Sequence, residues 1–426
     1  MNAPTVKGRC PSLMSPMEAG DGLLVRVKPR AATLAAEQAD AVAEAAGRYG
    51  NGIVELTNRG HLQIRGLSHA GIEGLCRSMA ESGLAGASPR AEAVRNVLAD
   101  PLGPDDPRTR FDSHDLARRL SLVLEDDPAL HALPDKFGIL VDAGIALPLA
   151  GCTADIAVRS EGGGATLSLG GGDRSLPLVV EAVEDAVRRL LSAFLSWLED
   201  GDRHDASRPP RMRTMVAACG AGGVFRAAGL HGETRPDERA GGPATRPLPG
   251  FVQVADGPRG CFLLGAPFGG IEAEKLAELA EMARLFSDGT IRISPWRAAV
   301  LCGVSRADTP ALRGRAAKAG FVVEPDDPRV RIVACAGRPR CASAEADTRA
   351  DAALVAASGR MPEGIVHVSG CAKGCAHPSP AAVVLLATPR GYDLIRNGGP
   401  VDTPERTGLT PEEAVHALAS PPGTAS

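Results

Sequence analysis

The sequence has few aromatic residues, little net charge and no long apolar run. Phenylalanine, tryptophan and tyrosine make up only 3% of the chain, which leaves few surfaces for stacking single-stranded nucleic acid. The formal net charge of −4 lacks the positive excess of a general nucleic-acid-binding surface. Neither a signal-peptide core nor an apolar run of about 18 residues occurs. We therefore expect a cytoplasmic protein with no nucleic-acid or membrane partner.

Four cysteines in the last quarter of the chain carry the strongest chemical signal. Cys335 and Cys341 form a C-x5-C pair, and Cys371 and Cys375 form a C-x3-C pair that would share one face of a helical turn. Thiolate sulfur is the soft ligand that iron–sulfur clusters and zinc select. Zinc sites favour tighter pairs, so the spacing favours a 4Fe–4S cluster, with zinc or four buried thiols as the alternatives. The other six of the ten cysteines lack paired spacing, and we expect reduced thiols there.

An internal repeat organises the chain. Residues 52–67, GIVELTNRGHLQIRGL, align without a gap on residues 289–304, GTIRISPWRAAVLCGV, and each segment is typical of two alternating strands joined by a turn. A strand and a helix precede each segment, and another helix follows it. This order predicts two split ferredoxin-like half-repeats related by a pseudo-two-fold axis. The expected helices are 34–48 and 273–286 before the hairpins and 71–82 and 310–319 after them.

These patterns predict an α+β fold with four domains, a number that suits a chain of 426 residues. The domains are a first ferredoxin-like half-repeat at 10–85, a central α/β domain at 86–235, a second half-repeat at 245–312 and a cluster domain at 320–420. Proline- and arginine-rich stretches at 202–213 and 233–250 are typical of linkers or surface loops. A short helix is expected at 411–418.

Five short motifs, in the same order, resemble the sulfite/nitrite reductase superfamily. They are LTNRGHLQIRG, VRNVLADPLG, LPDKF, CAGRPRC and SGCAKGCAHP. The N-terminal CPSLMSPMEAGDGLLVR and the C-terminal GYDLIRNG are most similar to one branch, the precorrin-3B synthases of aerobic cobalamin biosynthesis. The resemblance implies a two-repeat fold, a central site and a 4Fe–4S cluster. In the reductases the residue corresponding to Cys375 bridges the cluster to a sirohaem iron.

The resemblance also implies the ligand-binding residues. Guanidinium groups bind carboxylates bidentately. The two hairpins carry Arg59, Arg65, Arg292 and Arg297, which could ring one cleft or, alternatively, be solvated or pair with nearby protein carboxylates. If residues 59–65 form a regular strand, Arg59, Gln63 and Arg65 share one face of it. We predict Arg59, Gln63 and Lys136 as catalytic residues and Arg65, Arg95, Asn96, Arg292 and Arg297 as residues that bind the tetrapyrrole. Gln63 or Asn96 would serve as a neutral donor to the reacting acetate.

The implied activity is a monooxygenase reaction. Dioxygen would place a hydroxyl on precorrin-3A, and a ring acetate would close a lactone. A mononuclear non-haem iron would activate oxygen; its ligands are not evident, although His61, His69, His114, His367 and His377 are candidates. No glycine-rich dinucleotide fingerprint occurs in the sequence, so electrons should come from a separate NADH-dependent reductase.

Two other functions compete with this one. A sirohaem-dependent sulfite or nitrite reductase is the first, but Gly138 stands where the reductases carry lysine or asparagine, and glycine offers no side-chain donor to an oxyanion. A non-catalytic iron–sulfur electron carrier is the second, and the repeat and its arginines are more elaborate than that role requires. The visible spectrum of sirohaem separates the first alternative from the monooxygenase.

Overall fold

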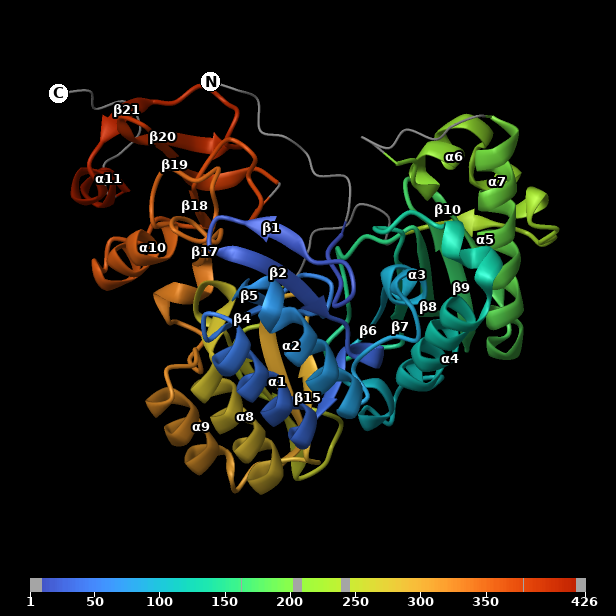
Figure 1. Cartoon of the computed structure of the whole chain (residues 1–426). Coiled ribbons are helices and arrows are strands. Elements are labelled where there is room, and N and C mark those ends of the chain that lie inside the picture. The colour runs from blue at the N-terminus through green and yellow to red at the C-terminus, as the bar shows by residue number, and fades with distance from the viewer. Residues whose placement is uncertain (1–9, 162, 202–208, 239–245, 378, 419–426) are drawn as a thin grey trace.

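Four β-sheets and the helices packed on them organise the chain (Figure 1). The computed structural model describes residues 10–161, 163–201, 209–238, 246–377 and 379–418. One apolar core runs through both repeats, and separate cores lie in the central and C-terminal domains. No helix within the described ranges is long and apolar enough to cross a membrane. The predicted α+β class is confirmed.

Each repeat forms a five-stranded sheet that includes one strand from the other repeat. The first sheet has the order β1 (Met17–Ala19), β2 (Gly22–Val27), β5 (Leu62–Leu67), β4 (Ile53–Leu56) and β14 (Gly270–Glu272). The other has the order β12 (Gly250–Gln253), β13 (Arg259–Gly265), β16 (Ala298–Ser305), β15 (Thr290–Ile293) and β3 (Thr33–Ala35). Both predicted hairpins are confirmed, and the exchange of β3 and β14 was not predicted.

The repeats also share a helical layer. Helices α1 (Ala36–Tyr49) and α8 (Ala273–Phe286) lie side by side beneath the two sheets (Figure 1). Both are rich in alanine, a strong helix former whose small side chain permits close packing. Helices α2 (His69–Glu81) and α9 (Thr309–Lys318) follow the two hairpins, as predicted. Together, the exchanged strands and packed helices make the two repeats one unit.

The central domain holds a six-stranded sheet. Its order is β11 (Arg235–Pro236), β10 (Arg174–Leu178), β9 (Gly164–Leu169), β8 (Ile156–Glu161), β7 (Ile139–Asp142) and β6 (Val97–Ala99). Its helices are α3 (Pro89–Val94), α4 (Ser113–Asp126), α5 (Val183–Asp200), α6 (Met212–Cys219) and α7 (Ala221–Ala227). The two predicted loops span 202–213 and 233–250, and their parts at 202–208 and 239–245 lie outside the described residues. The first prediction is wrong at its C-terminal end, because α6 begins at Met212. The second predicted loop contains the short strand β11.

The C-terminal domain brings both cysteine pairs to one edge of a sheet. Its strands are β17 (Ile332–Ala334), β18 (Val366–Ser369), β19 (Ala381–Thr388), β20 (Gly391–Gly398) and β21 (Arg406–Leu409), in that order. Helices α10 (Thr348–Ala357) and α11 (Pro411–Leu418) pack on it. Since β17 and β18 are parallel neighbours, the loops that follow them leave at the same edge.

Short 3₁₀ helices complete the connections. They span Arg30–Ala32, Gly103–Asp105, Pro128–Ala132, Val180–Ala182, Pro267–Gly269 and Pro328–Arg331. The helical turn predicted across the second cysteine pair is absent, because residues 371–375 form an irregular turn with Gly374 at φ 62°. Glycine adopts this left-handed conformation without the steric cost of a Cβ atom.

Candidate functional site

The four predicted cluster cysteines lie on the two loops that leave β17 and β18. The Gly370 amide donates a hydrogen bond to Cys335 Sγ at 3.3 Å, so the second loop contacts the first. Burial raises the pKa values of the Cys371 and Cys375 thiols, and the thiols of the other loop raise them further. Several thiolates together would need a positively charged partner.

This donor set fits an iron–sulfur cluster. No three His, Cys, Asp or Glu side chains in the described parts of the chain are grouped tightly enough to hold a single metal ion. A single tetrahedral zinc would need such a group, whereas a cubane spreads its four cysteine ligands over a larger volume. Thiolates are the soft donors that the predicted 4Fe–4S cluster requires, and the cluster stays a prediction.

A cationic pocket of about 330 Å³ lies between the repeats and the central domain. Its lining combines both hairpin turns with the loops around β6, β7 and β8. The lining residues are Asn58, Arg59, His61, Asn96, Leu98, Lys136, Gly138, Ile139, Leu140, Ala150, Gly151, Cys152, Thr153, Ala154, Arg211, Pro295 and Trp296. The structure thus brings the predicted Arg59, Asn96 and Lys136 together.

The first hairpin turn can reach the pocket because it contains a glycine. The Thr57 amide donates to the His61 carbonyl at 2.9 Å and closes the turn. Gly60, at φ 68°, lies so close to its neighbours that a Cβ atom would be 2.9 Å from Leu98 Cδ1 and 3.2 Å from the Ile293 carbonyl. Only glycine permits this approach without displacing neighbouring atoms, and the turn side chains thereby reach the pocket.

The pocket carries positive charge that protein carboxylates do not fully neutralise. Burial lowers the pKa of Arg59, and the nearby Arg211 and Arg26 lower it further. Burial likewise lowers the pKa of Lys136, and Arg59, Arg26 and Lys373 add to the shift. Lys373 lies between Cys371 and Cys375, so the second cysteine loop adds positive charge to the surroundings of Lys136. An anionic ligand would relieve this repulsion.

Arg211 and Trp296 are pocket residues that were not predicted. Asp155 accepts bonds from Arg211 Nε at 2.9 Å and from the Gly138 amide at 2.8 Å, which ties Arg211 to the wall of the pocket. Arg211 lay in a stretch interpreted as a linker. Trp296 occupies the position in the second repeat that aligns with Arg59 in the first, so the gapless alignment held a signal for it.

Arg65 and Gln63 face the protein rather than the pocket. Arg65 forms an ion pair with Asp21 at 3.2 Å and lies 3.7 Å from Glu55. Gln63 donates to Glu55, and its oxygen accepts from Arg26. The expected shared face with Arg59 is wrong, because Arg59 belongs to the turn before β5 and not to the strand. Binding of a substrate carboxylate by Arg65 stays a prediction, and that carboxylate would have to displace two protein carboxylates.

Three further predicted residues have protein partners. Arg95 pairs with Glu125 at 2.9 Å, and Arg292 pairs with Asp105 at 2.8 Å, so neither lines the pocket. Asn96 lines the pocket, but its amide nitrogen donates to three backbone carbonyls, and its oxygen accepts from Lys28 Nζ at 2.9 Å. It therefore has no spare donor for a substrate acetate.

Arg297 adopts a left-handed backbone at φ 58° next to Trp296. Burial lowers its pKa, Glu55 opposes that effect, and the thiols of Cys335 and Cys375 also raise it. Its guanidinium thus lies where the second hairpin meets the cluster loops. Of the four hairpin arginines, only Arg59 is among the residues that line the pocket.

The candidate iron-binding histidines are scattered. His61 is 3% exposed, and its Nδ1 has no partner within the described residues. His114 contacts the Asp100 carbonyl at 2.7 Å, and His69 is exposed at the start of α2. The His367 and His377 rings lie 5.9 Å apart. No three-residue set brings them together in the described chain, so iron ligands stay unassigned.

Gly138 lines the pocket at a position where the backbone conformation and the surrounding atoms do not require glycine. A Cβ atom there would meet only the Asn96 and Lys136 carbonyl oxygens, at 3.7 and 3.9 Å, which are ordinary contacts. Its amide is the donor to Asp155 already described. A Cβ atom would therefore fit sterically, and glycine leaves this wall of the pocket without a side-chain donor.

Comparison with known proteins agrees with this architecture. The nitrite/sulfite reductase ferredoxin-like half domain matches residues 15–82 and 261–319, which coincide with the two repeats. The fold and the site therefore define a protein of the nitrite/sulfite reductase class, whose members typically bind iron–sulfur clusters and sirohaem. A precorrin-3B synthase from Sinorhizobium sp is 34% identical over 401 residues, covering 92% of this chain and 83% of that protein. The chain belongs to the precorrin-3B synthase family within this class.

More distant relatives share the class. An assimilatory ferredoxin-dependent nitrite reductase from Haloferax mediterranei is 24% identical over 380 residues, covering 79% of this chain and 64% of that protein. The structure of the Mycobacterium tuberculosis NirA protein matches with a TM-score of 0.71 at 17% identity, covering 93% of this chain and 79% of that one. This structural match shows a common fold and supports the predicted two-repeat architecture.

Proposed function

We propose that the protein is a precorrin-3B synthase that hydroxylates precorrin-3A with dioxygen and closes a lactone. The observation that carries the proposal is the cationic pocket between the repeats and the central domain. Arg59, Lys136 and Arg211 line it, and Lys373 of the second cysteine loop adds to its charge. A precorrin carries many acetate and propionate carboxylates, which this charge would attract. The 34% identical relative supports the same assignment.

The pocket residues would bind and orient the tetrapyrrole. Arg59 donates one bond to the Lys136 carbonyl at 3.2 Å and keeps other donors for a carboxylate. Trp296 and Leu98 offer apolar surface to the macrocycle, while the cations hold its rim. Such positioning brings the reacting acetate against the electrophilic carbon, which is proximity catalysis.

A neutral donor suits the reacting acetate, because a tight arginine contact would reduce its nucleophilicity. Gln63 and Asn96 were expected in this role, but both are engaged by protein groups. Asn58 and Thr153 line the pocket and make no hydrogen bond through their side chains to the described part of the chain. We assign the neutral contact to these two residues.

Cys335, Cys341, Cys371 and Cys375 would hold a 4Fe–4S cluster. When bound, the cluster would supply single electrons that originate from NADH through a separate reductase. In the reaction, one oxygen atom enters the product as the hydroxyl, and the other leaves as water with two electrons and two protons. The described residues offer no three-ligand set for the mononuclear iron, so no step is assigned to it.

The test is a turnover assay with purified, cluster-loaded protein, precorrin-3A and a reductant, run in air and without oxygen. The hydroxylated product should form only in air.

The same three pocket cations could instead hold a small oxyanion, which keeps a sirohaem-dependent sulfite or nitrite reductase as the second candidate. Sirohaem absorption with nitrite or sulfite reduction, and no tetrapyrrole product, would favour that candidate.

A further inference from the structure

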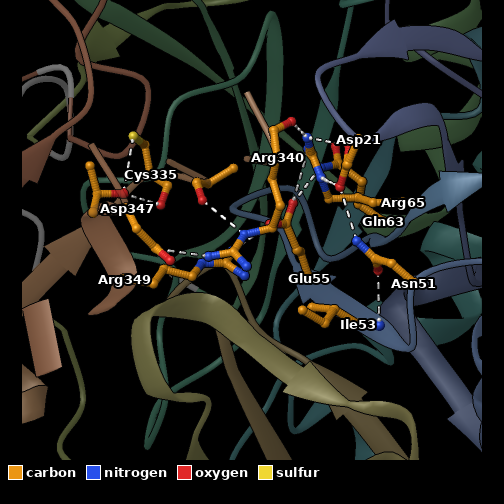
Figure 2. Close-up of polar contacts among 12 residues, drawn as sticks. Asp21, Asn51, Ile53, Glu55, Gln63, Arg65, Cys335, Arg340, Asp347 and Arg349 are labelled. Atoms are coloured by element: carbon orange, nitrogen blue, oxygen red, sulfur yellow. Dashed lines mark hydrogen bonds and ion pairs between the residues drawn. The ribbon is translucent and has the colours of Figure 1, made fainter. Parts of the chain in front are cut away.

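A buried ion-pair network joins the first repeat to the loop that carries Cys335 and Cys341 (Figure 2). Glu55 on β4 is its centre and is only 8% exposed. It accepts hydrogen bonds from Gln63 and from Arg349 on α10. Although burial would raise the pKa of Glu55, Arg349 and Arg65 hold it below its usual value. The carboxylate is therefore charged, and it links two domains.

Arg65 extends this network to the cysteine loop itself. Its guanidinium bonds Asp21 and donates to the Arg340 carbonyl, one residue before Cys341 (Figure 2). The Gly20 amide donates to the same carbonyl at 3.2 Å. Two donors from the first repeat thus fix one peptide group of the loop.

The backbone of the Cys335–Cys341 loop also packs closely against the turn between β1 and β2. A Cβ atom on Gly20 would lie 2.6 Å from the Pro339 carbonyl oxygen and 2.8 Å from the Ala342 nitrogen. Both neighbours are backbone atoms, which cannot rotate away as a side chain would. The glycine therefore permits the loop to lie flat on the first repeat.

The second arm of the network ends on a cysteine. Arg349, bonded to Glu55, follows Thr348, whose hydroxyl donates to the Cys335 carbonyl at 2.9 Å and lies 3.6 Å from Cys335 Sγ. Both ends of the C-x5-C loop are thus tied, through named contacts, to the hairpin that also supplies the pocket turn.

We propose that Gly20, Glu55 and Arg65 are positioning residues for the cluster, which they serve by fixing the Cys335–Cys341 loop against the first repeat. The inference rests on the proposed function, because it requires the cluster on the four cysteines. Hydrogen bonding and solvent exposure around the sulfurs set the reduction potential and the stability of such a cluster. A displaced loop would change the reduction potential and the rate of cluster loss without removing a cysteine ligand.

The test compares cluster-loaded variants with the wild type. Arg65→Met removes the charge, Arg65→Lys keeps the charge but not the planar fork, and Gly20→Ala displaces the loop without changing any charge. The matched controls are Arg48→Met, whose side chain is 67% exposed, and Gly314→Ala, whose Cβ would have no neighbour within 4 Å. Labile sulfide is followed in air, the midpoint potential is measured by EPR-monitored redox titration, and thermal unfolding is recorded separately.

We expect Arg65→Met and Gly20→Ala to lose labile sulfide at least about ten-fold faster, as for other residues that support metal ligands, and to shift the midpoint potential. Arg65→Lys should fall between them and the wild type, and both controls should match the wild type. Native sulfide loss and potential in both Arg65→Met and Gly20→Ala, even with lower thermal stability, would overturn the inference alone. A wild type without a cluster would instead overturn the proposed function on which it rests.

Discussion

In the proposed function, ligand binding depends most directly on Arg59, because it lines the pocket and keeps donors that no protein group in the described part of the chain accepts from. Replacing it with Met should weaken binding of a polycarboxylate tetrapyrrole by about 1.5–3 kcal/mol, the worth of a hydrogen bond to a charged group. Fluorescence titration with precorrin-3A, or with uroporphyrin as a stable surrogate, measures the change. Arg48→Met, on an exposed helix surface, should leave the affinity unchanged. Equal affinities for Arg59→Met and wild type would remove this turn from the site.

His61 makes the stability of the protein sensitive to acid. Burial, followed by the charges of Lys28, Arg26 and Arg59, holds the pKa of His61 well below 6.5 in the folded state. In the unfolded chain the imidazole binds a proton below about pH 6.5, so the free energy of unfolding falls as pH drops through that value. The stabilisation from the neutral His61 side chain is complete above about pH 6.5. Below that pH, the free energy of unfolding falls by about 1.4 kcal/mol per pH unit because of this histidine.

A His61→Gln variant should therefore lose less stability than the wild type between pH 7.5 and about 5.5. Urea unfolding at the two pH values measures the difference. Other buried histidines contribute equally to both proteins and cancel in the comparison. The same pH dependence in both proteins would show that the pKa of His61 is not lowered by folding.

Some site residues were predictable from the sequence and others were not. Arg59 and Lys136 lie in motifs whose neighbours form turns, and the structure places both at the pocket. Arg65 and Arg95 belong to equally good motifs, but carboxylates distant in the chain bind them. Arg211 was missed because its partner, Asp155, is 56 residues away in sequence. A sequence shows which residues carry charge, but not which partner the fold supplies.

The two cysteine loops are the elements that would hold the proposed 4Fe–4S cluster. Cys335→Ser should lose the brown chromophore and most labile sulfide, because a serine hydroxyl is a hard ligand that replaces a soft thiolate poorly. Iron and sulfide quantification, together with the visible spectrum, measures the loss. Cys219→Ser is the control, because Cys219 is an exposed thiol far along the chain from the four. A full cluster in Cys335→Ser would show that this loop is not a ligand.

The periodic elements were the most predictable part of the fold. Helices α8 and α11 begin and end where the sequence pattern placed them, since apolar and polar residues alternate there with helical periodicity. Strand β19, the run AAVVLLAT, was missed because a short apolar run does not separate strand from helix. The exchange of β3 and β14 was missed as well, because it pairs segments more than two hundred residues apart.

At the scale of the molecule, the exchanged strands make each repeat depend on the other. Leu34 on β3 and Ile271 on β14 are buried in a core that both repeats build. Residues 1–85 expressed alone should therefore lack a cooperative unfolding transition, because β14 and α8 are missing. Circular dichroism with heating tests this, and co-expression with residues 86–426 should restore the transition. Cooperative unfolding of the fragment alone would show that the half-repeat folds independently.

Isotope labelling tests most directly the proposal that dioxygen supplies the hydroxyl of the product. The cluster-loaded protein is incubated with precorrin-3A and a reductant under ¹⁸O-labelled dioxygen in unlabelled water, and the product is analysed by mass spectrometry. The proposed monooxygenase activity predicts one labelled oxygen atom per product molecule. An unlabelled product, or reduction of sulfite or nitrite with no tetrapyrrole product, would contradict the assignment.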